Sequence, residues 1–194
     1  MTDPVEADDA ATPLTPPERD GLIPTHITLR SELNELEQQN IADATAWAFE
    51  RKRNVLNEAF LKGLHRRMFN KVWRWAGQYR KAERNLGDAP HLIQPNLVQA
   101  IRDAQFWIEN KTYQLDELGV RFHHKAVLVH PFANGNGRWA RLAADLLVTS
   151  QGGTPFSWGG GDLQPAGKSR QAYIDALHAA DDHDLGPLIV FARS

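Results

Sequence analysis

The chain has 194 residues and contains no cysteine. This absence excludes disulfides, thiolate zinc sites, iron–sulfur clusters and cysteine nucleophiles. An excess of one sign of charge is also missing, because 22 basic residues stand against 24 acidic ones and the formal net charge is −2. The sequence therefore has no basic footprint for direct contact with nucleic acid.

Long apolar runs are missing as well. No stretch approaches the roughly 18 apolar residues that a membrane-spanning helix needs. The first residues lack the basic and apolar regions of a secretion signal. We therefore expect a cytoplasmic protein that makes no contact with a membrane.

Composition changes at Pro24, which divides the chain into an arm and a domain. Residues 1–24 are rich in proline and acidic side chains, so we predict a flexible arm that cannot bury enough apolar area to become ordered. Residues 25–194 are predicted to form a single all-α domain. Apolar residues recur there at helical spacing over about 33–48, 60–72, 97–108, 115–129, 138–149 and 170–180.

The helical period is interrupted between Tyr79 and Gln94. Turn-forming residues from Asn85 to Pro90 lie in this interval. This pattern favours a short β-hairpin, and an irregular loop between two helices remains the alternative.

A glycine-rich turn follows a histidine in the segment His130–Arg141, which reads HPFANGNGRWAR. Successive N–H groups in such a turn, at the start of a helix, form a cradle for phosphate groups. Arg138 and Arg141 are spaced to lie on one side of the helix and to bind phosphate oxygens. His130 has an ordinary pKa near neutrality and is the natural general base beside the cradle.

Two other interpretations of this region compete with that one. The segment could be a structural helix cap with scattered surface arginines, which accounts for the glycines but not for the histidine and the arginine spacing. His123, His124 and His130 lie close together in the sequence and could suggest a metal site. No partner cluster accompanies them, so we expect two histidines on a helix surface and one functional histidine.

The segment resembles the hallmark of the Fic domain family, His-x-Phe-x-Asp/Glu-Gly-Asn-Gly-Arg-x-x-Arg. Seven positions match this hallmark, namely His130, Phe132, Gly135, Asn136, Gly137, Arg138 and Arg141. Trp75–Arg80 and Tyr173–Phe191 also resemble family segments, and the likeness covers the chain from about Thr28. It implies a Fic-type helical bundle with one small hairpin, the flap, before the nucleotide-binding half. The whole layout of the chain, including Gly21–His26 and Glu32–Glu37, resembles a bacterial subgroup called mobile mystery protein B.

This resemblance implies transfer of AMP from ATP, with Mg²⁺, to a hydroxyl side chain of a target protein. His130 would take the hydroxyl proton, Arg138 would neutralise the phosphates being expelled, and Arg141 would hold the γ-phosphate. Phe132 would turn inward and fix the loop. The N–H groups that would hold the developing negative charge belong to Gly135, Asn136 and Gly137, and the amide of Asn136 would also contact phosphate or ribose.

Asn134 departs from the hallmark. AMP-transferring relatives carry Asp or Glu there as the Mg²⁺ ligand, and a neutral amide oxygen binds a hard cation more weakly than a carboxylate. The departure leaves open a transferase with another nucleotide donor, or a weakly catalytic regulatory partner of a helix-turn-helix protein, as the subgroup implies. The reverse reaction, removal of AMP by a phosphodiesterase, also remains open, with Glu32 aligning the water.

The resemblance also suggests two control features. Thr28–Asn34 approximates the family's inhibitory motif, so a helix at about 28–50 could bring Glu32 onto Arg141. The competing interpretation makes Glu32 an ordinary acidic residue in the first turn of a helix, where it meets the helix dipole favourably. The flap is expected to dock the target polypeptide by strand pairing, and its edge consists of His91, Leu92, Ile93 and Gln94.

Overall fold

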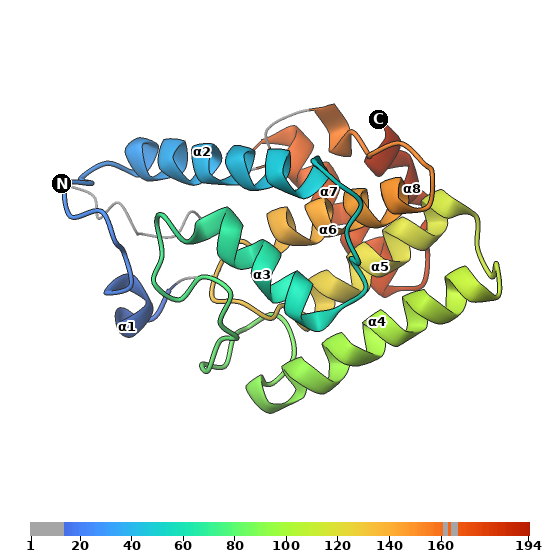
Figure 1. The fold of residues 1–194 in the computed structure, drawn as a ribbon, viewed down its shortest axis with the longest axis horizontal. Helices are drawn as coiled ribbons and strands as arrows, with labels where there is room; N and C mark the ends of the chain where they lie inside the picture. Colours follow the sequence, from blue (N-terminus) through green and yellow to red (C-terminus); the bar gives the residue numbers. More distant parts are fainter. Residues whose placement is uncertain (1–13, 161–162, 164–166) are drawn as a thin grey trace.

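The computed structural model describes residues 14–160, 163 and 167–194, and within them the chain is a helical bundle (Figure 1). The predicted all-α fold is confirmed. The sole β-type pairing of the described residues is an isolated antiparallel bridge between Leu22 and Trp73. None of the described helices is both long and apolar enough to cross a membrane. In chain order the helices are α1 (Pro16–Arg19), α2 (Arg30–Phe49), α3 (Glu58–Phe69), the 3-10 turn η1 (Pro90–Leu92), α4 (Ile93–Glu109), α5 (Leu115–Val129), α6 (Asn136–Ser150), the 3-10 turn η2 (Trp158–Gly160), α7 (Lys168–Asp181) and α8 (Gly186–Arg193).

Helix α6 lies at the centre of the bundle, and α5 packs along it (Figure 1). The apolar side chains of α6 pack into two separate hydrophobic cores. Trp139 and Leu142 belong to the larger core that α6 shares with α2, α3, α4 and α5. Ala144 and Val148 belong to a smaller core built with α7 and α8. Because both layers hold α6, the first turn of this helix is fixed between the α2–α3 layer and α7.

The predicted flexible arm is wrong for residues 14–24, which pack against the domain. Leu14 is buried, and the N–H of Ile23 donates to the carbonyl of Val72 at 2.9 Å. The apolar side chains and backbone bonds of this short stretch offset the entropy of ordering it. Residues 1–13, the rest of the predicted arm, lie outside the described residues.

The predicted hairpin is also wrong, and the alternative, an irregular loop, is correct. Residues 79–89 contain neither helix nor strand. His91 and Leu92 belong to η1, and Ile93 and Gln94 begin α4, so these four residues present no extended edge for strand pairing. Pro90 has its φ set for the first position of a helix, which favours the early helical start.

Candidate active site

His130 ends α5 in a left-handed backbone conformation, with φ 48°. This conformation is unfavourable for a non-glycine residue, and it persists only where the surrounding structure holds it. Arg80, which is only 4% exposed, does so. Its Nε donates to the carbonyl of His130 at 2.7 Å, and its backbone N–H donates to the carbonyl of Pro131 at 3.0 Å. Arg80 therefore fixes the backbone from which the imidazole projects.

The surroundings of His130 keep its imidazole neutral. Burial and then the nearby charge of Arg80 lower its pKa from 6.5 to about 4, with a smaller contribution from Arg84. A backbone hydrogen bond with Val127 acts in the opposite direction. The side chain is thus unprotonated near neutral pH and can accept a proton, as a general base must.

The loop of residues 79–89 passes directly over His130. Gly87 has φ 88°, and a Cβ there would lie 2.3 Å from the Cβ of His130, so only glycine allows this approach. Arg84 of the same loop forms a buried ion pair with Glu18 of α1. The N-terminal segment therefore helps to hold the loop that covers the histidine.

The turn before α6 has the geometry expected of an anion cradle. Gly135 has φ 78°, and a Cβ there would meet the ring of Phe69 at 2.4 Å. The N–H groups of Asn136, Gly137 and Arg138 fall in the first turn of α6, where a helix supplies no carbonyl partners. With the positive end of the helix dipole behind them, these groups favour a bound anion.

The side chain of Asn136 holds the loop and is not directed at a ligand. It is 2% exposed. Its Oδ1 accepts from the N–H of Phe132 at 2.9 Å, and its Nδ2 donates to the carbonyl of Phe132 at 2.8 Å. The expected contact of this amide with phosphate or ribose is therefore wrong. Phe132 is buried as expected, and its ring stacks on His65 with centroids 3.7 Å apart.

The two arginines of the motif contact different layers. Arg138 forms an ion pair with Glu37 of α2, with Nη1 and Oε2 2.6 Å apart. The guanidinium of Arg141 lies 5.3 Å from the ring centroid of Tyr173 on α7. The spacing of the arginines predicted that they share one side of α6, but their side chains contact different layers and do not converge on one point.

Glu32 is not the acid that reaches the motif. Its carboxylate is exposed and accepts from the N–H groups of Thr28 and Leu29 at 3.0 and 3.1 Å. These bonds hold its pKa below the ordinary value. The acid of α2 that contacts the motif is Glu37, further along the helix, and its partner is Arg138.

Asn134 has both of its oxygens engaged within the protein. Its Oδ1 lies 2.5 Å from the N–H of Gly135. Its carbonyl oxygen lies 3.0 Å from Nε2 of His65, whose Nδ1 accepts from the N–H of Gly77 at 3.0 Å. Among the described residues there is no group of three or more His, Cys, Asp or Glu side chains that could hold a metal ion. These residues do not fit a Mg²⁺ ion held by the protein.

Comparison with known proteins agrees with this geometry. Residues 55–148 match the model of the Fic/DOC family. The chain carries a Fic domain. It is 28% identical over 152 residues to a probable protein adenylyltransferase of Aquifex aeolicus, covering 75% of this chain and 42% of that protein. It is 31% identical over 117 residues to a protein adenylyltransferase of Caenorhabditis elegans, covering 59% of this chain and 22% of that protein. The chain thus spans less than half the length of these curated relatives.

Solved Fic domains share the fold. The Fic domain of a Bartonella quintana protein with bound ADP superposes with a TM-score of 0.66 at 17% identity, covering 87% of this chain and 86% of that one. BepC of Bartonella tribocorum with bound AMPPNP gives a TM-score of 0.66 at 19% identity, covering 91% of this chain and 95% of that one. At such identities the likeness concerns the fold.

Three residues that shape the Fic motif were missed by sequence reasoning. Arg80, His65 and Glu37 are all buried polar side chains that contact the motif from other elements. For Glu37 a signal was present. It shares the core-facing stripe of α2 with Leu33 and Ala44, and a charge on an apolar stripe requires a buried partner.

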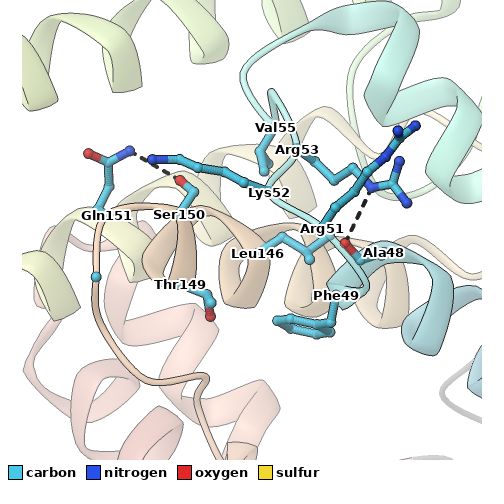
Figure 2. Close-up of a pocket in the computed structure, with 11 residues that line it drawn as sticks. Ala48, Phe49, Arg51, Lys52, Arg53, Val55, Leu146, Thr149, Ser150 and Gln151 are labelled. Atoms are coloured by element: carbon cyan, nitrogen blue, oxygen red, sulfur yellow. Dashed lines mark hydrogen bonds between the residues drawn. The ribbon is translucent and has the colours of Figure 1, made fainter.

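A further pocket is lined by residues outside the motif (Figure 2). Its volume is about 620 Å³, and it lies between the end of α2, the following loop and the end of α6. None of the motif residues line it. Arg53 there donates to the carbonyls of Trp47 and Ala48 at 2.5 and 3.5 Å. Arg53 thus meets the carbonyls at the C-terminal end of α2, where the helix dipole is negative.

Proposed function

We propose that this chain is a protein adenylyltransferase, which transfers AMP from ATP to a hydroxyl side chain of a target protein. The observation that carries the proposal is a neutral histidine, His130, beside the anion cradle at the start of α6. The names of the relatives and the nucleotides bound to structural neighbours point the same way.

The reaction follows from the roles that these groups can play. The hydroxyl oxygen attacks the α-phosphorus of ATP as His130 accepts its proton, and pyrophosphate leaves. The N–H groups at the start of α6 stabilise the negative charge that develops on the phosphoryl oxygens. Arg141 is available for the phosphates that leave, because within the described residues it forms no ion pair.

We further propose that α2 restrains this activity through Glu37. Its carboxylate occupies Arg138, the arginine expected to neutralise the leaving phosphates, and the pair is largely excluded from water. Polyphosphate and Glu37 would compete for one guanidinium. Autoinhibition by the first long helix is therefore retained, with Glu37 in place of Glu32.

A weakly catalytic regulatory protein, paired with a helix-turn-helix partner, is the second candidate. The observation that favours it is Asn134, which supplies no carboxylate and whose oxygens already contact Gly135 and His65. The reverse reaction has less support, because the acid assigned to align water, Glu32, caps the start of α2 instead.

Incubation with α-labelled ATP and cell lysate tests the proposal. We expect wild-type protein to label itself or a target, and His130→Ala to label 10²–10⁴-fold less. Parallel reactions with labelled UTP and γ-labelled ATP identify the donor. Absence of labelling from α-labelled ATP in wild type and in Glu37→Gln would overturn adenylyl transfer and favour the regulatory role.

A further inference from the structure

Arg141 has one close aromatic neighbour in the described structure, Tyr173 of α7. Its guanidinium lies over this ring, 5.3 Å from the centroid. Asp145, on the same helix, is engaged elsewhere. It accepts from the N–H of Phe156 and from Nε1 of Trp158, both at 3.0 Å. The direction of the Arg141 side chain is therefore set largely by Tyr173.

The phenol also borders the anion cradle. A Cβ added at Gly137 would lie 3.6 Å from Nη1 of Arg141 and 3.7 Å from the hydroxyl of Tyr173. Because glycine has no Cβ, this space is open. The hydroxyl and the guanidinium thus both border this space at the first turn of α6, where the phosphates are expected.

A buried histidine holds the hydroxyl in turn. Nε2 of His123 on α5 lies 2.9 Å from the Tyr173 oxygen. His123 is fully buried, contrary to the expected position on a helix surface. Burial first, and then the charge of Arg141, lower its pKa to about 3, so the imidazole is neutral. The phenol O–H can therefore donate to Nε2 of this neutral imidazole, and the bond fixes the ring of Tyr173.

We propose that Tyr173, held by His123, is a positioning residue that directs Arg141 at the terminal phosphates of the bound nucleotide. This inference rests on the proposed function. Tyr173 lies outside residues 55–148, which match the family model. The α7–α8 layer, by this inference, supplies part of the nucleotide site. Without the hydroxyl, Tyr173 loses its bond to His123 and its ring no longer fixes Arg141, which must then be ordered by the ligand at a cost in affinity.

Calorimetric titration of Tyr173→Phe with ATP, ADP and AMP tests this role. The substitution keeps the ring and removes the hydroxyl. We expect ATP affinity to fall about tenfold, because the hydrogen bond that fixes the Tyr173 ring under Arg141 is lost, and AMP affinity to stay unchanged. Tyr113→Phe is the matched control, because Tyr113 also lies under an arginine, Arg121, at the opposite end of α5 from His130. It should leave all three affinities as in wild type.

A double-mutant cycle with Arg141→Met decides whether Tyr173 acts through the arginine. In that background Tyr173→Phe should cause no further loss of ATP affinity. Equal losses for ATP and AMP, or no loss for either, would overturn the inference. Selective loss of ATP binding in a protein that transfers no AMP would support the inference and reject the proposed function.

Discussion

Glu37 and Arg138 form an ion pair that joins α2 to the first turn of α6, with Oε2 2.6 Å from Nη1. The other carboxylate oxygen, Oε1, accepts from Nε1 of Trp73 at 2.6 Å. The carboxylate is 5% exposed and the guanidinium 17%. Removing one partner of such a pair leaves the other charge buried without compensation. The pair therefore links the stability of the fold to the state of the nucleotide site.

Glu37→Gln should release Arg138 while retaining an acceptor for Trp73. We expect ATP to bind about tenfold more tightly, about 1.4 kcal/mol, and labelling from α-labelled ATP to rise. Stability without nucleotide should fall by about 3 kcal/mol. Calorimetry and urea unfolding measure the two effects. Glu32→Gln, an exposed change on the same helix, is the control and should leave ATP affinity unchanged. Equal ATP affinity in Glu37→Gln and wild type would contradict the restraint.

The rate of transfer should fall at acid pH, and the pH of this fall, the acid limb of the pH–rate profile, should depend on the charge of Arg80. His130 acts only when unprotonated, and its pKa is lowered to about 4. Transfer should therefore hold as the pH falls from about 8 to about 5 and be lost below about 4. Arg80→Met removes the larger of the two neighbouring charges and should move this limb toward 6.5, the ordinary value for histidine.

Arg84→Met provides a graded comparison, because Arg84 lowers the pKa of His130 less than Arg80 does. Its limb should shift in the same direction by a smaller amount. The midpoint pH of the acid limb is the quantity to compare, because loosening of the loop can lower the rate of transfer without changing this midpoint. Identical midpoints in wild type and both variants would show that Arg80 acts on the backbone of His130 alone.

Acid should destabilise the fold through three histidines whose pKa is lowered. The pKa of His65 and His123 is lowered to about 3, and that of His130 to about 4, with burial as the main cause. Below pH 6.5 these histidines are protonated in the unfolded chain but stay neutral in the folded one. The free energy of unfolding therefore decreases as the pH decreases, by up to about 1.4 kcal/mol per pH unit for each histidine. Asp145 has the opposite effect below about pH 6. Burial raises its pKa to about 6, so the folded chain binds this proton more readily than the unfolded chain.

Urea unfolding between pH 7 and 5 measures this slope. His65→Gln is a suitable variant, since glutamine keeps a donor for the carbonyl of Asn134 and an acceptor for the N–H of Gly77 but does not titrate. We expect its slope to be shallower by about 1.4 kcal/mol per pH unit. A slope equal to that of wild type would mean that His65 is protonated in the folded state.

Asn134→Asp should lower the Mg²⁺ requirement of transfer. The substitution is nearly isosteric, and a carboxylate oxygen can still accept from the N–H of Gly135. It adds the charged ligand that a hard cation prefers. A Mg²⁺ titration of label incorporation should show about tenfold faster transfer at limiting metal, about 1.4 kcal/mol of transition-state stabilisation. If the Asp variant is no faster at any metal concentration, Asn134 has another role.

Local chemistry determined much of this protein from the sequence by itself. Apolar spacing located the long helices, because one face of each must be buried. The motif from His130 to Arg141 was assigned correctly as a turn leading into a helix, since glycines allow the left-handed backbone that Gly135 adopts. Phe132 was expected to turn inward, and it is fully buried.

Only the tertiary structure decided which side chains meet. Arg138 pairs with a residue 101 positions earlier in the chain, and Tyr173 meets His123 across 50 positions. Helical spacing tells which face of a helix is buried, but not which charge or hydroxyl of another helix faces it. A hairpin was favoured over the irregular loop of residues 79–89 for the same reason. The buried guanidinium of Arg80 binds the carbonyls of Ala82 and Asp88, so these two need no partner strand.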